Sequence, residues 1–400
     1  LLLDRLVRQG RAFGMHVVLG SQTLSGAFSL ARTTMGQMGV RIALQCSEAD
    51  SQVILSDENL AARLLSRPGE AIYNDAGGLL EGNSPFQVVW LPDQVREQWL
   101  NLAQMKAQAE PPRRPLETII FEGNAPASLE ANAVLSGRAP AGTSALAPNL
   151  WLGEAIAIKD PTAIRLRRTT GANTIVVGQR DDAALAICAS SLLSMAAQAP
   201  GARVLLLDGT TADDPSFGAL ERMGRGLGLD VVTATPRELP DRLQELAAEV
   251  AARQEAGTAD APTVLLMAHG LHRMRALRRN EDDYGFGGGD AAPTPDKLFI
   301  GIAREGPTVG VHVLATVDTA TNMGRVLDRN GLREFDNRVL FQMSATDSST
   351  MVDSPAASRL GPERAMLYNE ELGIAEKFRF YAWPDGAWLE SASARLRGGA

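Results

Sequence analysis

Residues 174–208 read TIVVGQRDDAALAICASSLLSMAAQAPGARVLLLD, which is an apolar run, a short polar turn, a helical segment and a second apolar run. The apolar letters in both runs are continuous and do not alternate with polar ones. Strands of that kind are buried on both faces, as they are in the parallel sheets of α/β proteins. This stretch therefore predicts a strand, a turn, a helix and a second strand.

Further runs of the same kind follow along the chain. They are DVVTA from residue 230, TVLLMA from 263 and VHVLAT from 311, and helical segments such as ELPDRLQELAAEVAARQ lie between them. Alternation of buried strands with helices predicts an α/β fold with a largely parallel sheet. Ligands of such sheets bind beyond the carboxyl ends of the strands.

The chain also contains an internal duplication. GMHVVLGSQ from Gly14 recurs as GVHVLATVD from Gly310, 296 residues later. VRIALQCSEADS recurs as NRVLFQMSATDS, so that Arg41 and Arg338 are 297 residues apart. RPGEAIYN and FQVVWLPD recur in the same order, 295 and 292 residues later. A period this long implies two copies of a whole domain.

The duplication predicts the domain organisation. Residues 1–95 match the carboxyl-terminal part of a first copy, and residues 150–400 match a nearly complete second copy. Residues 96–149 between them are rich in Ala and Pro, which is typical of a linker. We expect the rest of the first copy, with its phosphate-binding residues, upstream of Leu1.

Composition and charge exclude several classes of protein. The chain is 45% hydrophobic and 22% charged, as globular proteins are. Its 39 basic and 47 acidic residues give a net charge of −8, so any contact with nucleic acid must be local. Cys46 and Cys188 lie far apart, which predicts a cytoplasmic protein without a metal site. No run predicts a membrane span, so a membrane tether would belong to an upstream region.

The turn after residues 174–177 stands where a phosphate-binding loop would lie. Of the pattern GxxxxGK[ST], only Gly178 remains. Asp181 and Asp182 stand at the start of the following helix, where carboxylates suit the helix dipole and repel a triphosphate. We predict a degenerate phosphate loop that binds neither ATP nor Mg tightly.

The strand from residue 263 also lacks residues that nucleotide hydrolysis needs. It ends in Ala268 and His269, where a nucleotide-hydrolysing domain places acidic residues for magnesium. We predict His269 on the surface. A group of arginines follows, at positions 273, 275, 278 and 279, and predicts an exposed helix that can contact an acidic partner.

In the first copy, Ser21 and Gln22 follow the predicted strand MHVVLG. An amide at that edge can orient a water molecule or contact a phosphate, and the alternative is a turn-capping role. Arg41 and its repeat Arg338 each begin a predicted strand. Each either reaches the nucleotide of a neighbouring subunit as an arginine finger or ties its strand to a helix.

The duplicated serine and aspartate pairs have a structural explanation. Ser47 precedes Asp50 by three residues, and Ser344 precedes Asp347 by three residues. This spacing is typical of a helix cap, in which the serine side chain accepts a hydrogen bond from the first turn. We assign both pairs to structure.

The blocks GRAFGMHVVLGSQTLS, VRIALQCSEADSQVIL and LLSRPGEAIY resemble the carboxyl-terminal half of the motor domain in the FtsK/SpoIIIE family of DNA translocases. The match is close over residues 1–95, and residues 150–390 resemble a diverged second copy. The resemblance implies a RecA-like P-loop NTPase fold, a homo-oligomeric ring, ATP and Mg in the intact protein, and movement along double-stranded DNA. Related motors of type VII secretion chain several such domains and move proteins instead.

The resemblance also implies roles for individual residues. Gln22 is similar to the sensor glutamine near the γ-phosphate, with Ser21 beside it in the nucleotide site. Arg41 is similar to the trans-acting arginine of the family, and Arg338 repeats it. The second copy has Asp318 in place of Gln22, which indicates that Gln22 carries chemistry and leaves both arginines open.

Three functions therefore stay open. The chain is part of an ATP-driven DNA translocase whose second domain is non-catalytic, which is our leading hypothesis. Alternatively, residues 150–400 form a docking or regulatory module that contacts the upstream motor half of the same protein. The third possibility is part of a protein secretion motor.

Overall fold

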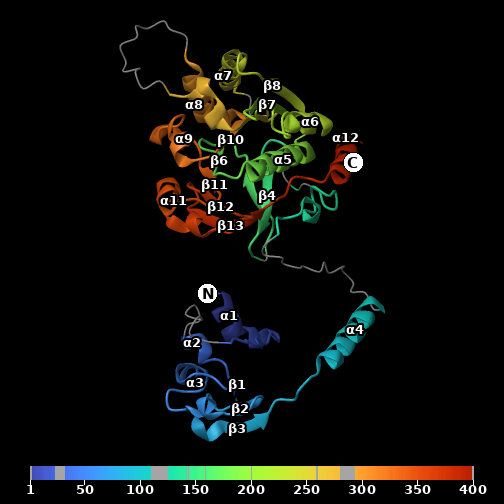
Figure 1. The fold of residues 1–400 in the computed structure, drawn as a ribbon, viewed down its shortest axis with the longest axis vertical. Helices are drawn as coiled ribbons and strands as arrows, with labels where there is room; N and C mark the ends of the chain where they lie inside the picture. Colours follow the sequence, from blue (N-terminus) through green and yellow to red (C-terminus); the bar gives the residue numbers. More distant parts are fainter. Residues whose placement is uncertain are drawn as a thin grey trace. The chain divides into compact units, whose positions relative to one another are not determined.

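The computed structural model describes residues 2–22, 32–109, 125–140, 142, 144–157, 159–199, 201–257, 260–279 and 293–398. The chain divides into two compact units, residues 1–119 and 120–400. Each unit is described by itself, and Figure 1 shows the elements of both. The predicted boundaries at residues 95 and 149 stay predictions.

The first unit contains an antiparallel sheet in the order β1-β2-β3. Its strands are β1 (Arg41–Leu44), β2 (Glu70–Asn74) and β3 (Asn83–Gln87). Its helices are α1 (Leu2–Gln9), α2 (Arg32–Met35), α3 (Glu48–Ile54) and α4 (Asp93–Ala109). The buried core is small and consists of Ala43, Leu55, Ala62 and Ile72.

The predicted strand MHVVLG at residues 15–20 is wrong. These residues lie in no helix or strand, and Val18 is 95% exposed. Its repeat in the second unit is β10 (Val311–Val317), which has a parallel neighbour on each side. A strand exists only where a neighbour satisfies its backbone groups, and residues 15–20 have no such neighbour among the described residues.

The second unit contains a sheet in the order β5-β4-β13-β12-β11-β6-β10-β9-β7-β8. The run from β11 to β8 is parallel throughout, and the strands from β5 to β12 extend it with antiparallel pairings. The strands not yet introduced are β4 (Asn149–Ala155), β5 (Thr162–Arg165), β6 (Thr174–Val177), β7 (Arg203–Asp208), β8 (Asp230–Ala234), β9 (Val264–His269), β11 (Asn337–Leu340), β12 (Arg364–Asn369) and β13 (Ile374–Phe380).

Helices cover both faces of this sheet (Figure 1). They are α5 (Asp181–Gln198), α6 (Ala219–Gly226), α7 (Leu239–Ala256), α8 (Pro295–Glu305), α9 (Ala320–Gly324), α10 (Arg329–Leu332), α11 (Ala345–Val352) and α12 (Gly386–Gly398). One core cluster joins α5 and α6 to one face, and a second joins α7, α8 and α11 to the other. Burial on both faces explains the continuous apolar runs, and the predicted α/β fold is confirmed.

The two units repeat one order of elements. The order β1, α3, β2, β3, α4 in the first unit matches β11, α11, β12, β13, α12 in the second. Both predicted caps are confirmed, because Ser47 and Ser344 accept hydrogen bonds from the amides of Asp50 and Asp347. Within the part of the chain that the structure describes, no helix has the length and apolar character needed to cross a bilayer.

Candidate functional site at the carboxyl edge of the parallel sheet

The parallel strands of the second unit bring polar residues to one edge. β6, β7, β9 and β10 run in the same direction, so their carboxyl ends meet there. β7 ends in Asp208 and β9 ends in His269. The predicted phosphate loop, residues 178–180, leaves β6 at the same edge and enters α5.

Apolar side chains fill the space beside this loop. Gly178 has φ of 149°, and a Cβ on it would lie 2.6 Å from Cβ of Phe341. Phe341 is buried and packs edge to face on Phe380, with ring centroids 5.6 Å apart. The guanidinium of Arg180 lies over the Phe380 ring, 5.7 Å from its centroid. Gly178 is therefore needed for close packing against a side chain.

The two carboxylates at the start of α5 are both paired with arginines. Arg180 donates from Nε and Nη2 to the carboxylate of Asp182, at 2.8 and 2.7 Å. These hydrogen bonds lower the pKa of Asp182 below its ordinary value. Arg273 donates from Nη2 to Oδ2 of Asp181 at 2.8 Å. The start of the helix thus carries two ion pairs.

The prediction that His269 is a surface residue is wrong. The residue is 4% exposed, because it ends β9 between β7 and β10. Its ring Nδ1 lies 3.1 Å from Oγ1 of Thr316, and that hydroxyl accepts a hydrogen bond from the amide of Gly270. Burial lowers the pKa of His269, so the ring is neutral near pH 7.

No family model matches the chain, and no curated protein matches it. Among solved structures, the cytoplasmic domain of the type VII secretion ATPase EccC from Thermomonospora curvata is 17% identical, with a TM-score of 0.55 over 99% of this chain and 47% of that one. ATPases 2 and 3 of the same EccC, in complex with a signal sequence peptide, are 11% identical, with a TM-score of 0.57 over 96% of this chain and 65% of that one. ATPases 2 and 3 of EssC from Geobacillus thermodenitrificans are 15% identical, with a TM-score of 0.53 over 95% of this chain and 67% of that one.

The chain has the fold of the type VII secretion ATPases EccC and EssC. The resemblance predicted from the sequence is thus confirmed at the level of the fold, as is the P-loop ATPase architecture. The chain spans 47% of the length of the EccC cytoplasmic structure.

The EccC-like fold implies ATP and Mg, but the edge residues of the second unit do not fit them. The loop is three residues long, has no lysine, and packs against Phe341. Asp181 and Asp182 would face the phosphates, whereas a phosphate loop needs amide donors and a lysine. No group of three or more metal-binding side chains occurs in the described ranges.

Arg338, the possible trans-acting residue, lies inside the EccC-like fold at the start of β11 and is 7% exposed. It donates from Nη1 to the carbonyl of Met351 at 2.7 Å and from Nε to that of Phe335 at 3.3 Å. Its Nη2 forms an ion pair with Glu370, and its guanidinium lies 5.9 Å from the ring centroid of Tyr368. In this arrangement the side chain ties a strand to the end of α11.

Arg41 repeats these contacts in the first unit. It donates from Nη1 to the carbonyl of Ile54 at 3.1 Å and from Nε to that of Met38 at 3.3 Å, and it also contacts the carbonyl of Leu55. The partners lie 13 residues after and 3 residues before the arginine in both units. This correspondence favours the structural alternative, and the arginine-finger role stays a prediction for both.

Ser21 and Gln22 lie in an exposed segment of the first unit. Residues 23–31, which complete the predicted turn, lie outside the described residues. Because residues 15–20 form no strand, Gln22 is not held at a sheet edge here, and its sensor role stays a prediction. The structure brings Gly178, Asp181 and Asp182 together in the second unit only.

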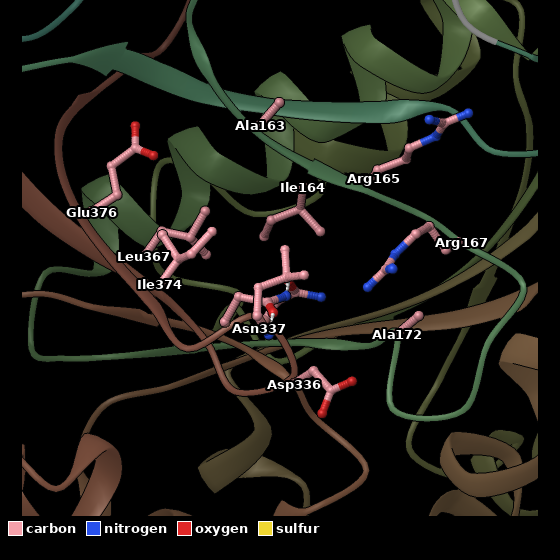
Figure 2. A pocket seen from close by; sticks show the side chains of 12 residues that line it. Ala163, Ile164, Arg165, Arg167, Ala172, Asp336, Asn337, Leu367, Ile374 and Glu376 are labelled. Atoms are coloured by element: carbon pink, nitrogen blue, oxygen red, sulfur yellow. Dashed lines mark hydrogen bonds between the residues drawn. The ribbon is translucent and has the colours of Figure 1, made fainter. Parts of the chain in front are cut away.

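A second feature lies at the amino end of β11. A cavity there has a volume of about 200 Å³. Figure 2 shows that Ile164, Leu367 and Ile374 are among the side chains that line it. The amides at its base have partners, since Asn369 donates to Oδ1 of Asn337 at 2.8 Å and Asn337 donates to the carbonyl of Asn173 at 3.0 Å. Burial raises the pKa of Asp336 at the rim. The cavity lies at the amino ends of β6 and β11, so it is separate from the candidate site at the carboxyl edge.

Sequence reasoning missed the pairing of Asp181 with Arg273, which are 92 residues apart. The predicted exposed helix after β9 is instead two short 3-10 turns, Leu271–Arg273 and Arg275–Leu277. The sequence did contain a signal for this pairing. It has a group of arginines at 273–279, and it has two carboxylates, Asp181 and Asp182, with no lysine near them in the loop. Only the strand order places these two segments together.

Proposed function

We propose that the chain is part of a multidomain secretion-type motor and that its second unit is an ATPase-fold module that does not hydrolyse ATP. One observation carries the second part of the proposal. At the position of a phosphate loop, two carboxylates pair with Arg180 and Arg273, and Phe341 packs on Gly178. Such a module acts by docking or regulation, most simply on the upstream motor half of the same protein.

The assignment to a secretion motor is supported by tandem organisation. The similar solved structures include ATPases 2 and 3 of EccC and EssC, and this chain matches them across both of its units. The EccC structure holds a signal sequence peptide. We infer that this chain also binds a signal sequence, and that the intact protein forms a homo-oligomer that uses ATP and Mg elsewhere.

ATP turnover tests the non-hydrolysing module. The chain of 400 residues alone should show no ATP hydrolysis above background, because the second unit lacks the lysine and the magnesium carboxylates. Turnover that is abolished by a substitution within residues 1–400 would overturn the proposal. In the intact protein, Gln22→Ala should lower turnover more than nucleotide binding, and unchanged turnover would return Gln22 to a turn role.

DNA translocation is the second candidate. It is favoured by the FtsK/SpoIIIE-like blocks of residues 10–73, although the net charge of −8 gives no broad attraction to DNA. Fluorescence anisotropy with a labelled signal sequence peptide and with labelled duplex DNA separates the candidates. Binding of the peptide alone supports the secretion motor. Salt-dependent binding of the duplex alone supports translocation of DNA.

A further inference from the structure

A cavity of about 460 Å³ lies beyond the carboxyl ends of β7 and β8. It is bounded by the loop after β7, by the start of α7 and by the two 3-10 turns after β9. β9 and β10 separate β7 from β6, so this cavity is distinct from the degenerate phosphate loop. Its place and size suit a small organic ligand, because open α/β sheets bind ligands at this edge.

One side of the cavity is apolar. It is formed by buried side chains from three elements, namely Leu207, Leu239 and Met274, together with Ala234 and Pro236. These residues offer no side-chain hydrogen bond, so they suit a flat apolar group such as an aromatic ring.

Polar groups from the loop after β7 line another part. Oδ1 of Asp208 accepts a hydrogen bond from the amide of Thr210 at 2.9 Å. Thr210 is 7% exposed, and its hydroxyl has no hydrogen-bond partner within the described residues. The hydroxyl oxygen is itself shielded from solvent, so it does not reach into the cavity. The Asp208 carboxylate can accept hydrogen bonds from the hydroxyl groups of a sugar.

Two arginines complete the lining. Arg273 is fixed by its ion pair with Asp181 and by a contact of 3.4 Å from Nη1 to the carbonyl of Gly209. Arg275 lines the same cavity, is exposed, and forms no ion pair with any residue that the structure describes. Paired guanidinium groups are suited to a phosphate, which they can bind with several charged hydrogen bonds.

We propose that this cavity binds a nucleoside monophosphate. The phosphate lies at Arg273 and Arg275, the sugar hydroxyls lie at Asp208, and the base lies against the apolar side. Asp181, which would repel a triphosphate at the phosphate loop, here positions Arg273 for the neighbouring cavity. The site requires neither magnesium nor hydrolysis, so it is independent of the motor function proposed above.

Calorimetric titration of the full chain with AMP, in the presence of EDTA, tests this proposal. We expect measurable binding that Arg275→Gln weakens by about tenfold or more, because a charged hydrogen bond is lost. The matched control is Arg279→Gln, an exposed arginine outside the cavity with no ion pair to the described residues, and it should leave the affinity unchanged. Asp181→Asn should weaken binding less than Arg275→Gln, because Asp181 only positions Arg273.

Each other outcome decides against the proposal. Absence of binding at millimolar AMP would overturn it, as would equal weakening by both arginine variants. Inorganic phosphate that binds as tightly as AMP would overturn the role of the apolar side. Thermal unfolding of each variant checks that the fold is retained, which we expect because all three substituted side chains lie at the protein surface.

Discussion

The duplicated arginine shows how one residue type can serve a structural role twice. Arg41 is the first residue of β1 and Arg338 is the second residue of β11, and each binds a carbonyl group at the end of the following helix. Helix ends leave carbonyls without partners, so a guanidinium there satisfies several acceptors at once. The sequence could show that this arginine is repeated, but only the contacts show what it binds.

Substitution of Arg338 separates the structural role from the trans-acting one. Arg338→Ala should lower the free energy of unfolding of the second unit by about 2–4 kcal/mol, because buried acceptors lose their partner. Chemical denaturation measures this loss. The exposed Arg333→Ala is the control and should have little effect. An unfolding curve that Arg338→Ala leaves unchanged, with loss of motor activity in the intact protein, would support the arginine finger instead.

His312 makes the second unit sensitive to acid. Its side chain is fully buried in β10, Nδ1 lies 3.0 Å from the carbonyl of Ala172, and Nε2 has no partner among the described residues. Burial, aided by the charge of Arg168, lowers the pKa of His312 from 6.5 to about 4. A folded-state pKa below the unfolded one gives full stability above pH 6.5, which is lost as the pH falls toward 4.

We therefore expect His312 alone to lower the free energy of unfolding by about 1.4 kcal/mol for each pH unit as the pH falls from 6.5 toward 4. Urea denaturation at several pH values measures the slope. His312→Leu should remove this part of it, whereas His16→Leu, at the exposed repeat position, should not. A slope that both variants leave intact would assign the acid sensitivity to other groups.

At the scale of elements, the apolar runs correctly predicted the strands whose hydrogen-bonding neighbours lie within the same unit. The runs at 174, 203, 230, 264 and 311 are strands, since each has a parallel partner. The identical pattern at residues 15–20 is not a strand, because pairing depends on neighbours and not on the apolar run itself. The pairing of Asp181 with Arg273 was equally hidden, since it depends on strand order.

The repeated helices α4 and α12 differ in how far they are buried. Leu100 and Ala392 each lie eight residues after the repeated proline, Pro92 or Pro384. Leu100 is 56% exposed and α4 has no buried residue, whereas Ala392 is 0% exposed and α12 packs on the core. The same sequence position is therefore a surface position in one unit and a core position in the other.

This difference gives a matched pair of substitutions. Ala392→Asp should destabilise the second unit by about 3 kcal/mol or more, because it buries a carboxylate without a partner. Leu100→Asp should change the stability of the first unit by less than about 0.5 kcal/mol. Thermal unfolding of both variants provides the comparison. Equal destabilisation by the two would mean that α4 is packed in solution.

At the scale of the whole molecule, the two units differ in the size of their cores. Among the residues that the structure describes, the first has a cluster of four buried apolar residues, and the second has large clusters on both faces of its sheet. Stability grows with buried apolar area, so the units should unfold in separate transitions, the first unit at the lower temperature. Scanning calorimetry of the full chain should resolve both.

Core substitutions assign the two transitions. Ile72→Ala should lower only the first transition and Leu206→Ala only the second, since each removes about 2–5 kcal/mol from the unit whose core it lines. Ile72 is 2% exposed in the small cluster, and Leu206 is 1% exposed in β7. A single transition that both variants shift equally would mean that the units unfold together.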